Sequence, residues 1–332
     1  MKRKLVSVII PVYKAKDYVA RTIRSVLQQT YKELEVIIVD DGSPDESIDV
    51  CRQFEDPRIK IIQQSNRGLA GARNTGIRHS TGDYIALIDA DDLWAIDKIE
   101  KHVEHLETNP KIGISFSYSE LIDEDDELMG VRQIPTKIKD ITPPYILRRN
   151  PIGNGSTPVF KREVFKDIEF KANLYGTEEV FYFDESFKRA EDVECWLRIA
   201  LETQWGCEGI PECLTLYRVN PGGLSASVLL QYEYLEKIID KYGKAYPEIF
   251  ADVVSLAKAY FQRYIARRAV SMRDGSLAVK MLHRSLATDL RILLEEPGKT
   301  LVTMGAAYFL YLVPMKVYVQ IEQAAMNVAK GF

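Results

Sequence analysis

The first 120 residues alternate between short apolar runs and segments with apolar side chains at helical spacing. Residues 6–13, 34–39, 59–62 and 84–88 are apolar and rich in β-branched residues, which is typical of strands covered on both faces. The segments between them carry apolar residues three and four positions apart, as amphipathic helices do. Strands that alternate with helices at this spacing predict right-handed βαβ units and an α/β fold with a mostly parallel sheet.

Polar side chains gather where these strands should end. Pro11 cannot donate a ladder hydrogen bond, so we expect the first strand to stop there and a loop to open near Tyr13. Asp-Asp-Gly-Ser follows the second run at residues 40–43, and Asp-Ala-Asp-Asp follows the fourth at residues 89–92. Because ligands of parallel α/β sheets bind at the carboxyl ends of the strands, these side chains predict one crevice.

Asp89 and Asp91 are candidate metal ligands. In an extended chain alternate side chains share a face, so the two carboxylates should point the same way. Neighbouring carboxylates repel, and one of them takes up a proton unless a cation lies between them. Hard oxygen ligands suit Mg²⁺ or Mn²⁺, which bridge protein carboxylates to substrate phosphates. The alternative is a solvated acidic loop, which the convergence of several polar strand ends disfavours.

Glycines follow the third strand rather than the first. The small-residue segment 66–76 leads into a helix, but the first strand-to-helix turn has no G-x-G-x-x-G fingerprint, and no G-x-x-x-x-G-K-[ST] occurs. A dinucleotide-binding Rossmann turn and a P-loop are therefore excluded.

Beyond the fourth strand, apolar spacing predicts a helix over residues 94–106 that includes Trp94 and Ile96, and then a strand over residues 112–118. The acidic run at residues 123–127 follows no apolar strand that would bring it to the crevice. We interpret it as a solvated turn.

Residues 189–198 predict an amphipathic helix with Glu191 and Asp192 in its first turn. The helix dipole favours carboxylates there, which is a purely structural reason for both residues. The functional interpretation is a general base at the rim of the crevice.

The pattern becomes helical after the last predicted strand, which suggests a domain at residues 1–225 and a helical region at residues 226–332. Residues 300–315 carry no charge, but they fall short of the ~20 residues that a membrane span needs, and Pro314 interrupts them. The tyrosines near residues 300–318 fit a helix that lies in the headgroup region of a membrane; the alternative is a buried core helix.

Composition and charge indicate which partners and which cellular compartment to expect. The formal net charge of −4 shows no basic stripe, so a nucleic-acid partner is not expected. The apolar run after the basic start of the chain is too short for a signal peptide, carries Pro11 and has no small-residue cleavage site. Four cysteines without C-x-x-C spacing fit thiols in a reducing cytosol, although Cys207 and Cys213 could meet across a turn. We expect a cytoplasmic protein, peripheral on the cytosolic face of a membrane if the tyrosine segment binds lipid.

Taken together, five motifs closely resemble those of the family 2 glycosyltransferases. They stand in the family's order over about residues 5 to 225: Val-Ile-Ile-Pro-Val-Tyr, Val-Asp-Asp-Gly-Ser, Gly-Leu-Ala-Gly-Ala-Arg-Asn-Thr-Gly, Asp-Ala-Asp-Asp and Glu-Asp-Val-Glu-Cys-Trp. The resemblance implies the GT-A fold, a nucleotide-diphosphate sugar donor, a divalent metal, Mn²⁺ or Mg²⁺, and inversion at the anomeric carbon.

The resemblance also implies roles for single residues. Tyr13, next to Pro11 in the first motif, is similar to the aromatic residue that lies against the nucleobase; a core tyrosine closing the strand is the alternative. Asp41 resembles the carboxylate that accepts the uracil imide N–H, and Asp40 would secure the turn. Arg73 resembles a residue that reaches the base or the diphosphate, unless it is an arginine on the helix surface.

In the same way, Asp89 matches the ribose-side carboxylate and, with Asp91, the metal ligands. Asp92 completes that motif or caps the next helix. Asp192 stands where the family has its general base, and Glu191 precedes it. Where the family often has a metal-binding histidine, this chain has Asn220, a weaker ligand, so a third metal contact is in doubt. None of the four histidines lies near these motifs.

These inferences favour an inverting glycosyltransferase that uses a nucleotide-diphosphate sugar as donor. The resemblance implies that the nucleotide is UDP. We expect the acceptor to be a glycan or a lipid-linked molecule. Two alternatives stay open. One is a non-catalytic nucleotide-sugar-binding protein, against which the retained carboxylates argue. The other is a sugar-phosphate nucleotidyltransferase, which would need a glycine-rich basic loop near the first strand.

Overall fold

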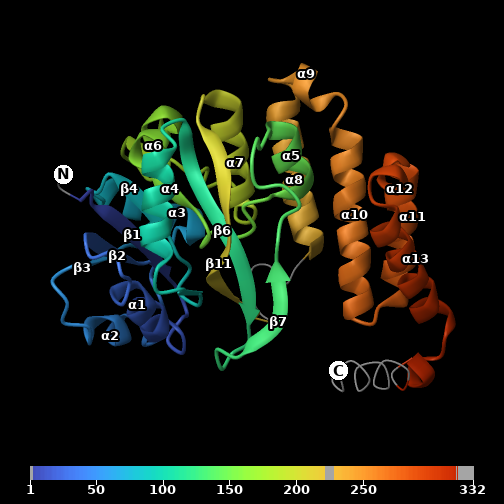
Figure 1. Ribbon diagram of the computed structural model, residues 1–332, viewed down its shortest axis with the longest axis horizontal. Helices are drawn as coiled ribbons and strands as arrows, with labels where there is room; N and C mark the ends of the chain where they lie inside the picture. Colours follow the sequence, from blue (N-terminus) through green and yellow to red (C-terminus); the bar gives the residue numbers. More distant parts are fainter. Residues whose placement is uncertain (1–2, 221–227, 319, 321–332) are drawn as a thin grey trace. The chain divides into compact units, whose positions relative to one another are not determined.

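Figure 1 shows the computed structural model, which describes residues 3–220, 228–318 and 320. The chain forms two compact units. The first comprises Met1–Ile146 and Asn150–Ala226, and the second comprises Leu147–Arg149 and Ser227–Phe332. The short segment Leu147–Arg149 thus belongs with the C-terminal helices, which no local sequence signal indicates.

Within the described part of the first unit, nine strands form one mixed sheet. They are, in chain order, β1 (Val6–Val12), β2 (Leu34–Asp40), β3 (Ile59–Gln63), β4 (Tyr84–Leu87), β5 (Leu93–Trp94), β6 (Ile112–Ile122), β7 (Leu128–Gln133), β8 (Val159–Lys161) and β11 (Gly206–Arg218). The spatial order is β3-β2-β1-β4-β8-β6-β11-β5, with β7 paired to β6. The strands β1 to β4 are parallel, as predicted, whereas β8 runs antiparallel between β4 and β6.

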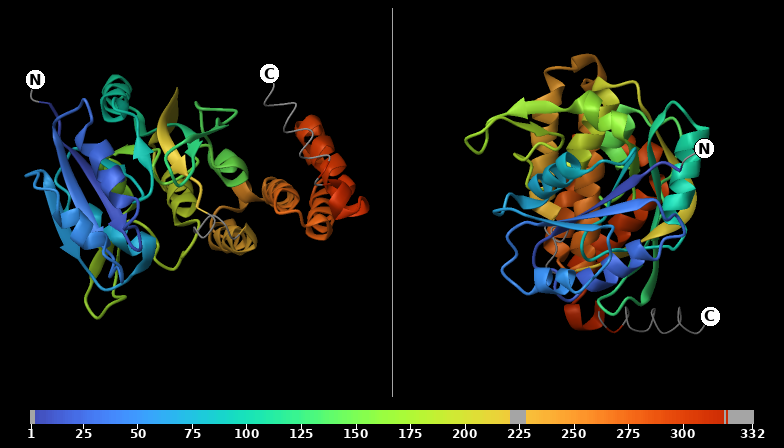
Figure 2. Two further views of the ribbon diagram at one scale, coloured as in Figure 1. Left: turned by 90° about the horizontal axis from the view of Figure 1, so that it is seen from below. Right: turned by 90° about the vertical axis from the view of Figure 1, so that its left-hand side faces the viewer.

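Helices cover both faces of this sheet (Figure 2). The helices of the first unit are α1 (Val19–Leu27), α2 (Ser47–Arg52), α3 (Gly68–His79), α4 (Lys98–Thr108), α6 (Arg162–Ile168) and α7 (Glu191–Glu202). The helix α5 (Pro143–Arg149) begins in the first unit and ends in the segment Leu147–Arg149 of the second. Alternate residues of β1 and β2 join α1, α2 and α4 in one apolar core, and α3 packs on the opposite face. A small hairpin of β9 (Phe170–Ala172) and β10 (Glu179–Phe181) completes the unit.

The close packing of α3 on β1 depends on a glycine. A Cβ atom at Gly76 would lie 2.3 Å from Cγ2 of Ile9, well inside van der Waals contact. Because Gly76 has no side chain, the helix can approach the strand closely enough to bring Arg73, one turn earlier, to the carboxyl end of the sheet.

The strand β1 continues one residue past Pro11, to Val12, so the expected end at Pro11 is wrong. Pairing with β4 stops at Ile9, whereas pairing with β2 continues to Val12. The carbonyl of Ile9 accepts a hydrogen bond on the β4 side, and Val12 accepts one on the β2 side. Pro11 therefore faces β4 beyond the end of that pairing, where its missing N–H costs no ladder hydrogen bond.

The predicted helix over residues 94–106 starts later than expected. Asp97 precedes the first turn of α4, and Trp94 lies instead on β5, paired with Thr215 of β11. The Trp94 side chain is buried, and its Nε1 donates a hydrogen bond of 3.0 Å to the carbonyl of Ser156. Ile96 is exposed. Helical spacing alone could not distinguish this short strand from a first helical turn.

The second unit is a helical bundle, as the C-terminal pattern predicted. Its helices are α8 (Val228–Gly243), α9 (Pro247–Phe250), α10 (Val254–Ser271), α11 (Gly275–Thr288), α12 (Arg291–Glu295) and α13 (Pro297–Leu312). The side chain of Asp274 caps α11 by accepting a hydrogen bond of 2.9 Å from the amide of Leu277. α10 and α11 form an antiparallel hairpin on which α13 packs.

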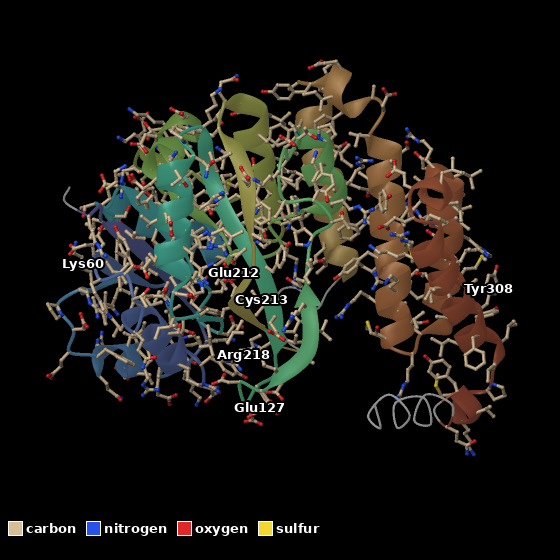
Figure 3. The ribbon with its side chains drawn as sticks, viewed as in Figure 1. Lys60, Glu127, Glu212, Cys213, Arg218 and Tyr308 are labelled. Carbon is tan, nitrogen blue, oxygen red and sulfur yellow. The ribbon has the colours of Figure 1, made fainter. Side chains whose placement is uncertain are left out.

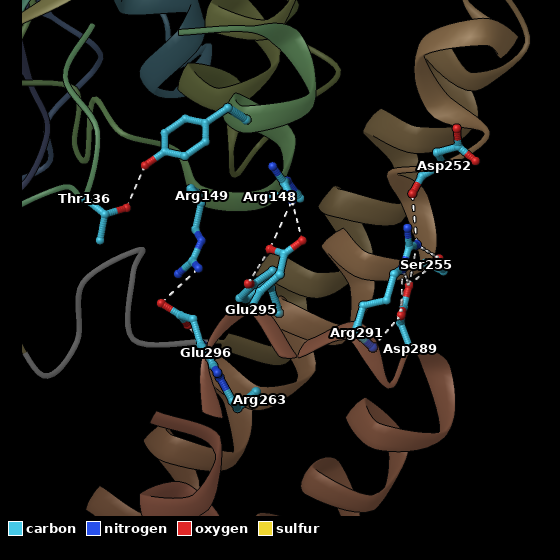
Figure 4. A network of polar contacts seen from close by, with 12 residues as sticks. Thr136, Arg148, Arg149, Asp252, Ser255, Arg263, Asp289, Arg291, Glu295 and Glu296 are labelled. Carbon is cyan, nitrogen blue, oxygen red and sulfur yellow. Dashed lines mark hydrogen bonds and ion pairs between the residues drawn. The ribbon is translucent and has the colours of Figure 1, made fainter. Parts of the chain in front are cut away.

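Ion pairs bind the segment Leu147–Arg149 to this bundle (Figure 4). Arg148 lies 3.2 Å from Glu295 at the end of α12, and Arg149 lies 2.9 Å from Glu296. Glu296 also pairs with Arg263 of α10. Burial opposes the charge of Glu296, but hydrogen bonds from Lys299, Arg149 and Arg263 outweigh burial and lower the pKa of Glu296 to about 2.

The helix α13 has a buried face and an exposed apolar face. Thr303, Ala307 and Leu310 are buried, whereas Val302 and Leu312 are 73% and 72% exposed. The buried face of α13 fits the core interpretation of this segment, and binding of its exposed face to a membrane stays a prediction. In the described ranges, no helix is both long and apolar enough to cross a membrane.

We predict that Glu35→Gln destabilises the first unit. Glu35 on β2 accepts hydrogen bonds from Ser7 (2.7 Å), the amide of Thr81 (2.5 Å) and Lys60 (2.9 Å). Burial opposes its charge, but these bonds outweigh burial and lower its pKa to about 2. The substitution should cost about 1–3 kcal/mol of unfolding free energy at pH 7, measured by urea denaturation.

The stabilisation that Glu35 provides should depend on pH, because its pKa is lowered in the folded chain. The pKa of Glu35 is lower in the folded chain than in the unfolded one, so its stabilisation is complete above the unfolded pKa of about 4.3. It is lost as the pH falls towards 2. The difference between wild type and Glu35→Gln should shrink over that window, and Glu33→Gln, an exposed neighbour, should have no such effect. A constant difference down to pH 2.5 would contradict the assignment.

Candidate active site

The turn after β4 carries three carboxylates, and hydrogen bonds fix its main chain. The amide of Asp92 donates to the carbonyl of Asp89 (3.1 Å), so residues 89–92 form a turn rather than the extended segment that we expected. The hydroxyl of Thr22 lies 2.9 Å from the carbonyls of both Ala90 and Asp92. The two carboxylates still interact within the turn, since the charge of Asp89, after burial, raises the pKa of Asp91.

Asp92 is a structural residue that is fully buried under this turn. Its carboxylate accepts hydrogen bonds from the Ser156 hydroxyl (2.6 Å) and from the amide of Arg218 (2.9 Å). It does not cap α4, the alternative role that we considered. Burial, together with the neighbouring Asp91 and Asp89, holds the pKa of Asp92 well above its ordinary value.

Asp91 is half-buried and lies beside the predicted third ligand. The Asn220 side-chain amide donates a hydrogen bond of 2.8 Å to Asp91 Oδ2. Burial and the charge of Asp89 raise the pKa of Asp91 to about 6. The amide nitrogen of Asn220 faces Asp91, whereas a metal ligand would present its carbonyl oxygen. Metal binding by Asn220 therefore stays a prediction.

Arg73 joins two of the predicted motifs. It is 1% exposed, and its guanidinium lies 2.8 Å from Asp89 Oδ1 and 2.8 Å from Glu191 Oε1. The alternative of an arginine on the helix surface is therefore wrong. Burial opposes its charge, but the neighbouring carboxylates outweigh burial and raise its pKa above the ordinary value. Contact of Arg73 with the base or the diphosphate of a nucleotide-sugar donor stays a prediction.

The two carboxylates at the start of α7 lie in different surroundings. Glu191 is buried against Arg73, whereas Asp192 is partly exposed and accepts a hydrogen bond of 2.7 Å from the amide of Val193. Burial raises the pKa of Glu191 to about 7 and also raises the pKa of Asp192. Ala190, which precedes the helix, has a left-handed φ of 54°, a strained conformation of a kind that gathers at functional sites.

Asp41 holds the start of α3. One carboxylate oxygen accepts hydrogen bonds from Gln64 Nε2 (2.7 Å) and the amide of Arg67 (2.8 Å), and the other accepts one from the amide of Gly68 (2.8 Å). Asp41 thus satisfies main-chain donors at the positive end of the helix dipole. A carboxylate has about four acceptor positions, so one further donor can be accommodated. The predicted nucleobase contact is compatible with this arrangement but is not tested by it.

The loops after β1 and β2 differ in exposure. Tyr13 is 46% exposed, so it is not the core tyrosine of the alternative interpretation, and Pro11 is buried within the sheet. Asp40 secures the second loop as expected, since it accepts hydrogen bonds of 2.9 Å from the amide of Ser43 and from Gln63.

The acidic run at residues 123–127 is more than a solvated turn. It connects β6 to β7, and Asp126 pairs with Arg21 and with Arg218, which Figure 3 labels near the end of β11. Arg218 is fully buried and also donates a hydrogen bond of 2.8 Å to the carbonyl of Asp91. The run therefore supports the carboxylate turn through Arg218, which joins Asp126 to the carbonyl of Asp91.

Asn74 directly follows Arg73 on α3 and is buried. It belongs to a motif given above, but the sequence analysis assigned it no role. Its Oδ1 accepts hydrogen bonds from the amides of Tyr182 (3.0 Å) and Phe183 (2.8 Å), and its Nδ2 donates to the carbonyl of Phe183. It fixes the segment that leads to α7. The adjacent Arg73 and Asn74 could have been recognised as buried polar residues only from the small residues around them, which allow close packing.

The donor set fits a cation that takes most of its ligands from a substrate. In the part of the chain that the structure describes, no group of three or more His, Cys, Asp or Glu side chains could hold a metal ion alone. Asp89 has one carboxylate oxygen bound to Arg73, and Asp91 has a raised pKa that a nearby cation would lower. Mg²⁺ and Mn²⁺ sites that use one or two carboxylates plus phosphate oxygens have this composition.

Comparison with known proteins identifies the family. The family model described as glycosyl transferase family 2 matches residues 7–169. An Escherichia coli protein named UDP-Glc:alpha-D-GlcNAc-diphosphoundecaprenol beta-1,3-glucosyltransferase WfaP is 34% identical over 226 residues, which cover 68% of this chain and 81% of that protein.

This chain belongs to the family 2 glycosyltransferases. It is therefore a transferase enzyme, and its family is one of glycosyltransferases rather than of nucleotidyltransferases. Other relatives are much longer, and the chain spans 33% of the length of two Rickettsia glycosyltransferases that it matches.

Solved structures of other glycosyltransferases share the fold. S. aureus TarS in complex with UDP-GlcNAc superposes with a TM-score of 0.54 at 18% identity, covering 94% of this chain and 82% of that one. A Pyrobaculum calidifontis mannosyltransferase in complex with GDP-Man and Mn²⁺ gives a TM-score of 0.55 at 22% identity, covering 94% and 88%. The expected GT-A fold, followed by a helical region, is confirmed.

We predict that Arg73→Lys disables this glycosyltransferase. A lysine keeps the charge but cannot bind Asp89 and Glu191 together, so one buried carboxylate loses its partner. The variant should lose about 1–3 kcal/mol of stability and most of its transfer rate, measured by thermal unfolding and by a sugar-transfer assay on folded protein.

A matched control is Arg198→Lys. Arg198 is also buried, and it binds Glu194 (3.1 Å) and the carbonyl of Ile168 (2.7 Å) away from the carboxylate turn. It should lose similar stability but retain more of its transfer rate. Wild-type turnover by Arg73→Lys would show that transfer does not depend on the ion pairs of Arg73 with Asp89 and Glu191.

Proposed function

We propose that this enzyme transfers a sugar, with inversion, from a UDP-linked donor to a hydroxyl group of a lipid-linked glycan acceptor in cell-surface glycan synthesis. The observation that carries the proposal is the contrast between the carboxylates at the start of α7. Glu191 is buried and bound to Arg73, whereas Asp192 is partly exposed and its carboxylate is bound only to a main-chain amide among the described contacts.

In the proposed mechanism Asp192 is the general base. It takes the proton of the acceptor hydroxyl while that oxygen attacks the anomeric carbon in line with the departing diphosphate, so one displacement inverts the configuration. The pKa of Asp192 is raised by burial, which makes it a stronger proton acceptor than an exposed aspartate. Glu191, fixed by Arg73, sets the orientation of the first turn of α7. A divalent metal held by Asp89 and Asp91 would supply Lewis-acid stabilisation of the leaving diphosphate.

The proposed donor site lies at the carboxyl ends of β1, β2 and β4. Tyr13 is exposed enough to lie against a nucleobase, and Asp41 retains an acceptor position for an imide N–H. Asp89 is the proposed ribose-side carboxylate. A carboxylate acceptor suits the imide N–H of uracil, whereas adenine and cytosine have no ring N–H to donate. UDP is further favoured because one relative is named for UDP-Glc and one solved neighbour is in complex with UDP-GlcNAc.

The proposed acceptor is a sugar on a lipid carrier. The Escherichia coli relative is named for a diphosphoundecaprenol-linked acceptor. An acceptor of that kind lies at a membrane surface, and the outer face of α13 offers exposed apolar side chains there, with Lys299 and Lys316 on either side. We therefore propose peripheral attachment to the cytosolic face of a membrane.

The test of the function is a donor panel with a base variant. Wild-type protein should show a melting shift with a UDP-sugar and Mn²⁺ and should transfer that sugar to a polyprenyl-diphosphate acceptor. Asp192→Asn should keep the donor-induced shift and lose about 10²–10⁴-fold in turnover, because it removes only the proton acceptor.

Glu191→Gln is the companion variant. It should weaken turnover less than Asp192→Asn and should lower stability more, since Glu191 is the buried partner of Arg73. A larger turnover loss in Glu191→Gln would show that the two roles are exchanged. A GDP-sugar as the sole effective donor would refute the nucleotide assignment.

Membrane attachment is tested by charges on the outer face of α13. Val302→Glu with Leu312→Glu should reduce flotation with anionic liposomes, because both side chains are exposed while Thr303 and Leu310 hold the helix to the bundle.

The control places the same charges at exposed apolar residues of the first unit. Ile96→Glu with Leu174→Glu changes side chains that are 60% and 54% exposed. This variant should float as wild type does. Equal flotation by wild type and by the α13 variant would remove that helix from the proposal.

A further inference from the structure

One serine contacts the carboxylate turn from a segment outside the recognised motifs. Ser156 precedes β8 and is fully buried. Its hydroxyl accepts a hydrogen bond of 2.9 Å from the amide of Asp89 and donates one of 2.6 Å to Oδ2 of Asp92. A single oxygen atom therefore joins the first and the last residue of the turn.

We propose that Ser156 is a positioning residue, which fixes the turn of residues 89–92 so that Asp89 and Asp91 present their carboxylates to a divalent cation bound with the donor diphosphate. The inference rests on the proposed function for the identity of that ligand. It assigns to Ser156 a role that acts through its hydrogen bonds to Asp89 and Asp92 rather than through ligation.

The serine is itself held in place. Its amide donates a hydrogen bond of 3.0 Å to Oδ1 of Asn154, and the Nδ2 of Asn154 donates one of 2.9 Å to the Ser119 hydroxyl on β6. Its carbonyl accepts the hydrogen bond from Trp94 Nε1 on β5. The position of Ser156 is thus determined by strands on the far side of β8 from β4, and it transmits that position to the turn.

Gly155, the residue before Ser156, packs directly against Arg73, which binds Asp89 and Glu191. A Cβ atom at Gly155 would lie 2.1 Å from Nη2 of Arg73, so only glycine fits without moving the guanidinium. Arg73 Nη2 is the atom that binds Asp89. Residues 154–156 therefore reach Asp89 twice, through its amide by Ser156 and through its carboxylate by the space that Gly155 leaves for Arg73.

Loss of the hydroxyl should loosen the ligands without removing one. In Ser156→Ala the amide of Asp89 loses its acceptor, and of the described donors to the Asp92 carboxylate the amide of Arg218 remains. Groups that orient metal ligands typically change metal affinity by about 10–100-fold when they are removed. We expect a loss of that size in Mn²⁺ affinity, measured by calorimetry in the presence of UDP.

Ser7→Ala is the matched control. The Ser7 hydroxyl is also fully buried, donates to a carboxylate (Glu35, 2.7 Å) and accepts from an amide (Gly82, 2.8 Å), but it lies near the amino end of β1. It should lose comparable stability with no change in Mn²⁺ affinity. Ser156→Thr, which keeps the hydroxyl, should bind Mn²⁺ more tightly than Ser156→Ala does, even where its extra methyl group lowers stability.

Amide hydrogen exchange tests the positioning directly. In protein without donor or metal, Ser156→Ala should exchange faster than wild type in the peptide covering residues 84–92, and Ser7→Ala should not. Unchanged exchange and Mn²⁺ affinity in Ser156→Ala would overturn the proposal, as would an equal loss of affinity in Ser7→Ala or in Ser156→Thr. Because exchange needs no substrate, it decides the role of Ser156 even if wild-type protein transfers no sugar, a result that would count against the proposed function alone.

Discussion

A buried arginine between two carboxylates determines how this site is built. Arg73 binds Asp89 after β4 and Glu191 at the start of α7, and nearly all of its surface is removed from water. A buried charge is tolerated only when it is paired, so the three side chains stabilise one another and none is free to move alone. The carboxylate turn after β4, proposed to face the donor, and the start of α7, proposed to face the acceptor, are therefore connected by an ion pair. Asp192 follows Glu191 at the same helix start.

Asp41 shows how structural and functional roles can coincide in one residue. Its carboxylate satisfies the first amides of α3, and that helix carries Arg73 in its second turn. The same carboxylate is the proposed partner of the nucleobase. A base bound there would meet a group already held by hydrogen bonds, so little conformational entropy would be lost on binding.

Local patterns predicted most of the fold and the identity of the central carboxylates. The strands β1 to β4, the helix that carries Glu191 and Asp192, and the helical end of the chain follow from periodicity. Trp94 was misplaced because its strand is two residues long and exists only through pairing with β11. Ser156, Asn74 and the buried position of Arg218 depend on partners far along the chain. No spacing rule reveals such contacts, since each is determined only when the strands have assembled.

The distances along the chain between these partners have a consequence for folding. Arg73 lies 118 residues before Glu191, and Asp92 lies 126 residues before Arg218. During synthesis from the amino terminus, the four parallel strands can pair before α7 and β11 have left the ribosome. Until then Arg73 and Asp92 lack partners that they have in the native state. Native contacts of such long sequence separation form late and slowly, so the first unit reaches its native state only after nearly all of its residues are made.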